Sequence, residues 1–600
     1  MNNGFLRTTL VSPKFVLGKP SDNILVMLDE AKKASGDILV FPELATTGYT
    51  MDDYFYHQDL LNASDNAIAT FLSKNPFKGV VVIGAPFVWE NIIYNCAIVI
   101  QKDRILGIVP KMYLPHTSEF YESRWFQDGE GVQTITTFLG QNVPFGIIVF
   151  KSEEYSFAVE VCADMWGPVN PSSNLYLAGA EVVVNISASP EVVDKFNMRR
   201  TLANSISYRH KGAYLYVSSN ANESSTSVVF SGDTFVSQMG TVIAEDKEIG
   251  FETKVVHADV DVQYLQHVRR SNGWYRQARK RTPLQYETVA FTANNHSFEL
   301  LAPLDETPFI PKSNQNSTFD QIRNLQSISL LRRLQVLPKP KVVLGLSGGL
   351  DSTLALLVCV DAFKKQGFPL TDIYAYILPS KHSSQTTQSN ARALAKGLGV
   401  SFEEQSIQDK VDSELKSLDH TTIDTTYENV QARMRTLFLM NKANQVGGLV
   451  IGTSDMSEIA LGFSTYAGDQ TAHYGVNAGL PKTLVRFMVE QFINVYPALQ
   501  EVLTSVVQTP ISPELRDAQV SESIIGSFEI NDLILYRFLK FGDGVDRLTK
   551  LFPTYEQQIK DFFTTFNRSQ FKRATMPNAA KILFSGLSPM ADLRLPSDLL

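Results

Sequence analysis

The feature that most constrains this 600-residue chain is a short loop, Ser347–Ser352, that reads SGGLDS between a predicted strand and a predicted helix. Gly348 and Gly349 leave backbone amides open to an approaching phosphate. The helix that starts there adds aligned N–H groups and the positive end of its dipole. The loop therefore predicts a phosphate site, with Asp351 placed to hold magnesium. The alternative is a plain turn in which Asp351 caps the helix.

Strand-length apolar segments alternate with helical segments on both sides of this loop. The predicted strands are 342–346, 372–378 and 449–452, and the predicted helices are 353–365, 384–398 and 430–445. This rhythm predicts a doubly wound parallel sheet that binds ligands at the carboxyl ends of its strands.

The first part of the chain reads as strands with fewer helices. Strands are predicted at 37–41, 80–87, 145–150, 157–161, 181–186 and 213–217, and helices at 24–34 and 192–209. This layout predicts sheets covered by helices. The regular pattern weakens from about residue 264 to residue 315. We therefore expect one domain at 1–265, a linker at 266–315 and a second domain at 316–600.

Composition narrows the possible functions. The net charge of −8 disfavours a broad nucleic-acid surface. The three cysteines form neither a disulfide framework nor a zinc motif. No apolar run approaches the 18 residues of a membrane span, and the N-terminus lacks a signal pattern. We expect a soluble, cytoplasmic protein.

The loop SGGLDS resembles that of the N-type ATP pyrophosphatases, and the Walker motif is absent. The segments around residues 428–435, 452–458, 463–469, 481–485, 509–516 and 571–573 resemble NAD synthetase. This resemblance implies an adenine nucleotide α hydrolase-like fold with ATP, deamido-NAD and Mg²⁺. The implied ATP-binding residues are Gly345, Ser347, Gly348, Gly349, Asp351, Ser352, Leu378, Thr453 and Ser512. The implied deamido-NAD-binding residues are Asn429, Arg433, Glu458, Phe463, Asp469, Lys482 and Lys572. The implied magnesium ligands are Asp351 and Glu458.

Three segments of the first part resemble the nitrilase (carbon–nitrogen hydrolase) family. They read FPEL at 41–44, PKMYLP at 110–115 and EVCADMW at 160–166. The resemblance implies an α-β-β-α sandwich and a catalytic triad of Glu43, Lys111 and Cys162. Cys162 would attack an amide carbon, Glu43 would move its proton, and Lys111 would stabilise the oxyanion and depress the thiol pKa. A buried, inert cysteine is the alternative for Cys162 alone.

Glutamine is the implied amide, but two positions depart from the family's pocket. The implied glutamine-binding residues are Thr117, Phe120, Glu122, Ala163 and Ser189. The family usually has Glu where this chain has Ala163, and its long form tends to have Tyr where this chain has Thr117. Loss of a charged partner could weaken binding by about ten- to a hundredfold.

Together the two parts resemble glutamine-dependent NAD synthetase over nearly the whole chain. The fusion implies ammonia transfer through a tunnel. The family resemblance implies a homo-oligomer, with an octamer as the usual arrangement for relatives with this fused layout. Other hypotheses stay open: an ammonia-dependent synthetase with an impaired or altered amidase, another amidase-fused N-type pyrophosphatase, or an adenylate-binding scaffold. The net charge weighs against an RNA-modifying enzyme, and the five retained site residues Glu43, Lys111, Cys162, Asp351 and Glu458 weigh against a scaffold.

Overall fold

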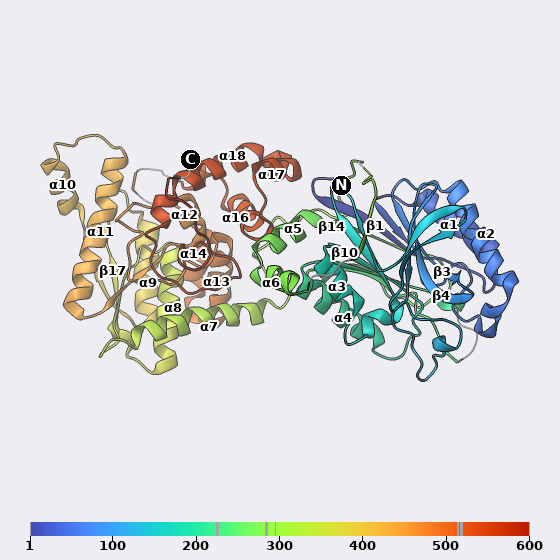
Figure 1. Ribbon diagram of the computed structural model, residues 1–600. Helices are drawn as coiled ribbons and strands as arrows, with labels where there is room; N and C mark the ends of the chain where they lie inside the picture. Colours follow the sequence, from blue (N-terminus) through green and yellow to red (C-terminus); the bar gives the residue numbers. More distant parts are fainter. Residues whose placement is uncertain are drawn as a thin grey trace. The chain divides into compact units, whose positions relative to one another are not determined.

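The computed structural model describes residues 2–223, 227–282, 286–294, 296–512, 515–516 and 520–598. The chain forms two compact units, Met1–Pro303 and Leu304–Leu600, which can be followed by colour in Figure 1. The range 266–315 is more regular than its sequence indicates, because it contains helix α6 (Gly273–Arg281) and strand β15 (Glu287–Ala290) as well as parts of α5 (Val262–Ser271) and α7 (Gln315–Leu334). Strand β15 pairs with strand β8 (Ile148–Lys151), so this part of the expected linker belongs to the core of unit 1.

Unit 1 is built from two mixed sheets in its described residues. The first sheet has the order β14 (Lys254–Asp261), β1 (Phe5–Ser12), β2 (Ile38–Val40), β3 (Val80–Trp89), β4 (Ile92–Gln101), β5 (Arg104–Pro110), β7 (Gln141–Gly146), β6 (Gln133–Phe138). The second has the order β13 (Thr241–Asp246), β12 (Thr234–Gln238), β11 (Ala213–Ser218), β10 (Val182–Ser187), β9 (Ser156–Val161), β8 (Ile148–Lys151), β15 (Glu287–Ala290). The helices are α1 (Pro20–Lys33), α2 (Gln58–Lys74), α3 (Pro171–Ala178), α4 (Lys195–His210), α5 (Val262–Ser271) and α6 (Gly273–Arg281).

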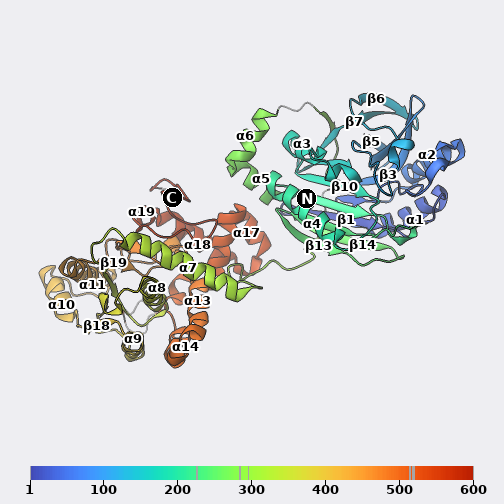
Figure 2. The same ribbon diagram turned by 90° about the horizontal axis from the view of Figure 1, so that it is seen from below.

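Unit 1 has four layers, with helices on the outer face of each of two packed sheets. Apolar residues that alternate between the two faces of each strand explain this arrangement. Ile38 and Val40 of β2 lie in the cluster between the two sheets, together with Val184 of β10. Leu39, between them, points to the other face and packs in the cluster formed with α1 and α2. On the second sheet, Val183 of β10 packs in the cluster formed with α3 and α4. The predicted α-β-β-α sandwich is confirmed, and its helices can be followed in Figure 2.

The predicted strand at 145–150 is in fact two strands. β7 ends at Gly146 in the first sheet, and β8 begins at Ile148 in the second. Both halves are apolar because both are buried: Phe145 packs in the cluster formed with α1 and α2, and Ile148 packs in the cluster between the sheets. The sequence pattern alone therefore does not reveal where the chain changes sheets.

Unit 2 contains a parallel five-stranded sheet in its described residues. Its order is β18 (Ser401–Glu404), β17 (Ile373–Ile377), β16 (Val342–Gly345), β19 (Leu449–Gly452), β20 (Tyr474–Gly475). The chain builds outwards from β16 in both directions, which places a crevice for ligands at the carboxyl end of that strand. The predicted doubly wound fold is confirmed.

Helices cover both faces of this sheet. Those that pack with one face are α7 (Gln315–Leu334), α8 (Leu350–Gln366), α9 (Gln385–Leu398), α13 (Lys482–Val495) and α14 (Gln500–Gln508). Those on the other face are α10 (Gln408–Ser417) and α11 (Thr425–Val446). The remaining helices are α12 (Met456–Leu461), α15 (Glu522–Ile525), α16 (Phe528–Tyr536), α17 (Val545–Leu551), α18 (Glu556–Arg568) and α19 (Gln570–Arg573). None of the described helices is long and apolar enough to cross a membrane.

Candidate active sites

The ends of three strands in unit 1 bring Glu43, Lys111 and Cys162 together. Glu43 follows β2, Lys111 follows β5 and Cys162 follows β9. The Lys111 Nζ atom lies 2.7 Å from Glu43 Oε1, and both side chains are fully buried. The thiol of Cys162 is close enough to both groups for their charges to act on its pKa. The three residues expected from the sequence therefore share one site.

A second carboxylate completes the surroundings of Lys111. Glu122 Oε1 lies 2.6 Å from Lys111 Nζ and accepts a hydrogen bond of 2.7 Å from the Tyr49 hydroxyl. Burial alone would lower the pKa of Lys111, but Glu122 and Glu43 outweigh burial and raise it. Burial raises the pKa of Glu122 to about 7, although Lys111 opposes this shift.

Glu43 is also fixed from two other sides. Asn95 donates to its Oε1 atom over 2.7 Å, and the backbone N–H of Ala188 donates to its Oε2 atom over 2.7 Å. A carboxylate held in this way keeps one orientation towards the thiol.

The backbone turns sharply at the cysteine. Cys162 has a φ of 44°, in the left-handed region that a non-glycine residue enters at a cost of about 1–3 kcal/mol. Asp164 holds the turn, because its carboxylate accepts from the backbone N–H of Val161 (2.9 Å) and of Tyr113 (2.8 Å). The bond to Tyr113 also ties the turn to the segment that carries Lys111.

The expected depressed thiol pKa is wrong for this structure. Burial and the charge of Glu43 raise the pKa of Cys162 to about 12, and the ammonium of Lys111 only partly opposes them. The sequence analysis named Lys111, Glu43 and Glu122 at this site, but it did not account for burial or for the charge of the two carboxylates, which both raise the thiol pKa. The resting sulfur is therefore a thiol, and Glu43 is the group positioned to accept its proton as it reacts.

The other expected glutamine-binding residues differ in their burial. Ser189 is buried and its backbone N–H donates to Ser218 Oγ over 3.0 Å. Phe120 and Ala163 are half-buried, whereas Thr117 is exposed. Ala163 offers only a methyl group where the family usually has a carboxylate.

Lys195 is a candidate functional residue that the sequence reasoning missed. Its ammonium donates to the Pro190 carbonyl over 2.8 Å and lies 5.9 Å from the ring centres of both Phe120 and Trp166. Burial lowers its pKa, while the charge of Cys162 acts in the opposite direction, so the ammonium lies near the nucleophile. The available signal was a cation in the first turn of helix α4, where the helix dipole disfavours one.

In unit 2, the loop after β16 has the geometry expected of a phosphate cradle. Gly348 has a φ of 83°, and a Cβ atom there would lie 1.9 Å from the Thr387 carbonyl oxygen, so no other residue fits. The Gly349 N–H donates to Ser347 Oγ over 3.2 Å, and the Ser347 and Ser352 hydroxyls lie 3.0 Å apart. Helix α8 begins at Leu350, so its N-terminus faces the loop. Gly345 ends the strand that leads into the loop.

Next to this loop, the ammonium of Lys482 lies among three carboxylates. It is 2.7 Å from Asp351 Oδ2, 2.8 Å from Glu458 Oε1 and 2.9 Å from Asp455 Oδ2. Burial would lower the pKa of Lys482, but the three carboxylates raise it well above its usual value. Burial raises the pKa of Glu458 to about 7. The structure thus brings Asp351, Glu458 and Lys482 together.

The same carboxylates suit a magnesium ion. One oxygen from each of Asp351, Asp455 and Glu458 lies within 4.8 Å of the others. Asp351 Oδ1 is buried and has no hydrogen-bond partner among the described residues. Hard oxygen ligands and an unsatisfied carboxylate oxygen fit Mg²⁺.

Two further residues of this site were missed by the sequence reasoning. Asp455 is the N-cap of α12 and accepts from the Glu458 N–H over 2.8 Å. Its spacing of three residues from Glu458, on one side of a helix, was the available signal. Asn477 is buried and donates to the carbonyls of Asp351 (2.9 Å) and Thr453 (3.1 Å), which joins the loop to the end of β19. Nothing in its sequence context marks it.

The remaining expected nucleotide residues form two groups. Lys572 donates to the carbonyls of Gly462 and Ser464, both over 2.7 Å, and so lies against the segment that carries Phe463 and Asp469. The Asp469 carboxylate is turned inwards onto the Thr465 N–H at 2.7 Å.

The second group lies around helix α11. Arg433, which is exposed, donates to the Tyr466 carbonyl over 3.3 Å, and Asn429 is half-buried on the same helix. Leu378 has a buried side chain at the end of β17. Ser512 lines a groove with His382, whereas the neighbouring Pro513 and Glu514 lie outside the described residues.

Fold and sites together define a class: an amidase-like sandwich joined in one chain to an ATP pyrophosphatase-like nucleotide-binding unit. The carbon–nitrogen hydrolase family model matches residues 19–270, and the NAD synthase family model matches residues 325–576.

The chain is 35% identical to a glutamine-dependent NAD(+) synthetase of Mycobacterium tuberculosis, over 100% of this chain and 96% of that protein. It is 27% identical to that of Aquifex aeolicus, over 96% of each chain. The crystal structure of a glutamine-dependent NAD(+) synthetase from Cytophaga hutchinsonii matches with 19% identity and a TM-score of 0.41, covering 99% of this chain and 97% of that one. The chain therefore belongs to the family of glutamine-dependent NAD(+) synthetases, which are ATP-dependent carbon–nitrogen ligases.

Proposed function

We propose that unit 1 hydrolyses glutamine at Cys162 and that unit 2 uses the ammonia to convert deamido-NAD to NAD at the expense of ATP. The products are NAD, AMP, pyrophosphate and glutamate. The observation that carries the proposal is the pair of buried lysine–carboxylate clusters, one beside a thiol and one beside a phosphate loop, in a chain of this family.

In unit 1, the Cys162 sulfur attacks the side-chain amide carbon of glutamine while its proton passes to Glu43. Because the thiol pKa is raised, proton transfer accompanies the attack rather than preceding it. Lys111 stabilises the negative oxygen of the tetrahedral intermediate. The C–N bond then breaks, and ammonia leaves with the proton from Glu43. Water hydrolyses the thioester and releases glutamate.

In unit 2, the nicotinate carboxylate of deamido-NAD attacks the α-phosphorus of ATP, and pyrophosphate leaves. Ammonia then attacks the adenylated carboxyl carbon, and AMP leaves. The SGGLDS loop binds the phosphates, while Lys482, Arg433 and Lys572 offset the growing negative charge. Asp351 and Glu458 would hold Mg²⁺, which screens the charge of the phosphates when bound.

Ammonia transfer through a tunnel is part of this proposal, because the two reactions belong to one chain. The family resemblance alone supports assembly into a homo-oligomer, for which an octamer is the expected size, and a cytoplasmic location.

A second candidate is an NAD synthetase that uses free ammonia or another amide. Ala163 and Thr117 favour it, because neither supplies a carboxylate or an aromatic ring to hold glutamine. Lys195 and Ser189 support glutamine, because a cation and a hydroxyl suit its α-carboxylate.

The test measures NAD and AMP formed from ATP and deamido-NAD, with saturating ammonium or with glutamine, in the wild type and in Cys162→Ala. We expect the wild type to use both nitrogen sources and Cys162→Ala to use only ammonium. Product with ammonium alone in the wild type favours the second candidate. No product with either source would refute NAD synthesis.

A further inference from the structure

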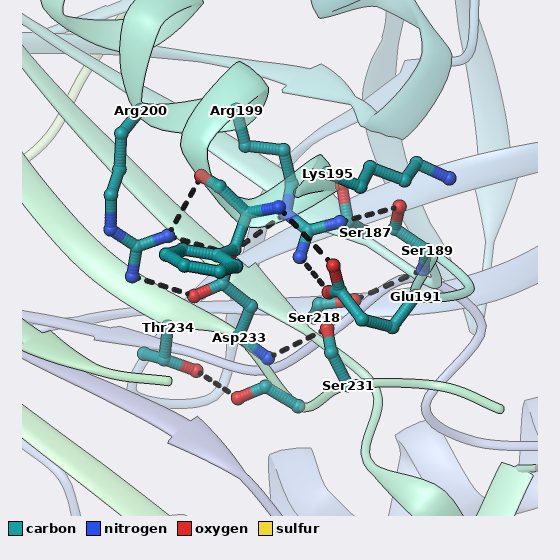
Figure 3. Close-up of polar contacts among 12 residues, drawn as sticks. Ser187, Ser189, Glu191, Lys195, Arg199, Arg200, Ser218, Ser231, Asp233 and Thr234 are labelled. Carbon is teal, nitrogen blue, oxygen red and sulfur yellow. Dashed lines mark hydrogen bonds and ion pairs between the residues drawn. The ribbon is translucent and has the colours of Figure 1, made fainter. Parts of the chain in front are cut away.

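A buried arginine lies directly behind the expected glutamine-binding serine. The guanidinium of Arg199, on helix α4, donates to Ser189 Oγ over 3.4 Å and to Asp233 Oδ2 over 2.7 Å, and it pairs with Glu191 (Figure 3). Its side chain is fully buried. Burying a cation is costly unless it is paired, and here two carboxylates pair it.

The adjacent arginine makes different contacts. Arg200 shares Asp233 with Arg199, at 2.9 Å from its Oδ1 atom (Figure 3). Arg200 also binds Glu245 at 2.6 Å. Within the described part of the chain, Arg200 makes no hydrogen bond or ion pair with Ser189 or Glu191. Both arginines therefore bind Asp233, but Arg199 is the one that also contacts Ser189 and Glu191.

The contact with Arg199 decides what the Ser189 hydroxyl can do. A guanidinium only donates, so Ser189 Oγ must accept from it. The hydroxyl proton is then left to point away from Arg199, as a donor. The residue before Ser189 supplies the N–H that holds Glu43 at 2.7 Å, so the same segment borders the catalytic base.

The charges around this segment also matter. Lys195 begins the helix that carries Arg199, and its ammonium lies near Cys162. Glu191 lies in the same segment and would repel an anion. Its pairing with Arg199 removes that repulsion, which leaves the Ser189 hydroxyl and the Lys195 ammonium facing a substrate carboxylate.

We propose that Arg199 is a positioning residue for substrate selection in unit 1, and that it makes the Ser189–Lys195 segment a receptor for the α-carboxylate of glutamine. The inference rests on the proposed function and deepens it. Arg199 touches no substrate. It acts by orienting Ser189 and by neutralising Glu191.

The test compares two amides that differ only in the α-carboxylate: glutamine and 4-aminobutanamide. We expect Arg199→Met to raise the KM for glutamine by about ten- to a hundredfold, with a smaller change in kcat. We expect kcat/KM for 4-aminobutanamide to change by less than about threefold, because that amide makes no use of the carboxylate receptor. Arg199→Lys should fall between the wild type and Arg199→Met. If turnover of 4-aminobutanamide is too slow, its inhibition constant against glutamine serves instead.

Arg200→Met is the matched control, since it removes a cation from the same helix and from the same aspartate. We expect it to keep the glutamine KM within about threefold of the wild type. Ammonium-dependent NAD synthesis should be unchanged in every variant, and thermal unfolding reports whether unit 1 still folds.

An unchanged glutamine KM in folded Arg199→Met would overturn the inference. So would an equal loss with both amides, or the same loss in Arg200→Met, since either result indicates a structural role only. A wild type that makes NAD with ammonium but hydrolyses no glutamine refutes the glutamine part of the proposed function instead, and that result is visible before any variant is measured.

Discussion

Both units place a lysine ammonium among carboxylates at the ends of strands, but the two clusters differ in charge and in access. Lys111 faces two carboxylates, Glu43 and Glu122, and all three side chains are at most 1% exposed. Lys482 faces three carboxylates, of which Asp351 is 19% exposed and Glu458 is 18% exposed.

This difference in charge and exposure indicates which cluster can take up an external cation. In unit 1 every oxygen of Glu43 is bonded, and the residue Cys162 is 8% exposed. Of the two carboxylates there, only Glu122 keeps a buried oxygen, Oε2, without a hydrogen-bond partner among the described residues. In unit 2 the excess negative charge and the unsatisfied Asp351 Oδ1 call for an external cation. This difference agrees with the proposed roles, which are covalent chemistry at the first site and binding of charged phosphates at the second.

Removing each lysine in turn gives the largest expected effects. We expect Lys111→Met to lower glutamine-dependent NAD synthesis by about 10²–10³-fold or more, because it removes the oxyanion donor, and to leave the ammonium-dependent rate intact. Lys482→Met should lower both rates by at least about 10²-fold. Parallel rate assays with the two nitrogen sources measure both effects.

Lys14→Met, at an exposed lysine, is the control and should alter neither rate. Loss of the ammonium-dependent rate in a folded Lys111→Met variant would show that the two clusters do not work separately. Each buried lysine also balances carboxylates, so either variant should lose about 3–5 kcal/mol of stability in its own unit, and thermal unfolding checks this.

Exchanging one carboxylate in each cluster tests the cation requirement. Asp351→Asn keeps the size of the side chain and removes its charge. We expect the Mg²⁺ concentration for half-maximal ammonium-dependent activity to rise about ten- to a hundredfold. Binding of Mn²⁺, followed by its paramagnetic resonance signal, should weaken in parallel.

Glu43→Gln is the matched change in unit 1 and should leave the Mg²⁺ requirement where it is. If Asp351→Asn and the wild type need the same Mg²⁺ concentration for half-maximal activity, Asp351 is not a ligand of the metal.

The pH dependence of alkylation distinguishes a resting thiol from a resting thiolate at Cys162. With a thiol pKa near 12, we expect the rate with iodoacetamide to rise about tenfold per pH unit between pH 7 and pH 9, without a plateau. Cys162 should still react before Cys96 and Cys359, because those two are completely buried. Mass spectrometry of the modified peptides gives the rate at each site. A plateau below pH 8 would support the depressed pKa expected from the sequence.

The two clusters also show which site residues can be predicted from the sequence. Each member of the Glu43, Lys111 and Cys162 set lies in a short segment that follows a strand, and the resemblance of these segments to the nitrilase family is what pointed to the three residues. The SGGLDS loop was equally visible, because glycine and serine between a strand and a helix have a local physical meaning.

What the sequence missed depends on contacts between distant segments. Asn477 matters because its amide reaches Asp351 and Thr453, and no local pattern records that. The shift of the Cys162 pKa was predicted in the wrong direction. Burial and the charge of Glu43 raise this pKa, and they outweigh the ammonium of Lys111, which lowers it. The split of the 145–150 strand was missed because Phe145 and Ile148 are both buried, although they pack in different apolar clusters.

The smallest expected effect concerns the outer edge of the unit 1 cluster. The Tyr49 hydroxyl donates to Glu122 Oε1 over 2.7 Å, and this bond lowers the pKa of a carboxyl that burial raises to about 7. Tyr49→Phe removes the bond, so the pKa of Glu122 rises further and more of it is neutral at pH 7. A neutral Glu122 holds Lys111 less firmly. We expect glutaminase kcat/KM at pH 7 to fall about three- to tenfold, in line with one hydrogen bond of about 0.5–1.5 kcal/mol.

The acid side of the glutaminase pH profile should move to higher pH in Tyr49→Phe, because ionisation of Glu122 then requires a higher pH. Tyr56→Phe removes a hydroxyl from an exposed tyrosine of the same unit and should leave the profile in place. Ammonium-dependent synthesis has no contact with this hydroxyl and should stay constant in both variants. The Lys111 ammonium lies 6.0 Å from the centre of the Tyr49 ring. A fall in kcat/KM of the same size at every pH would mean that Tyr49 acts through this packing and does not change the pKa of Glu122.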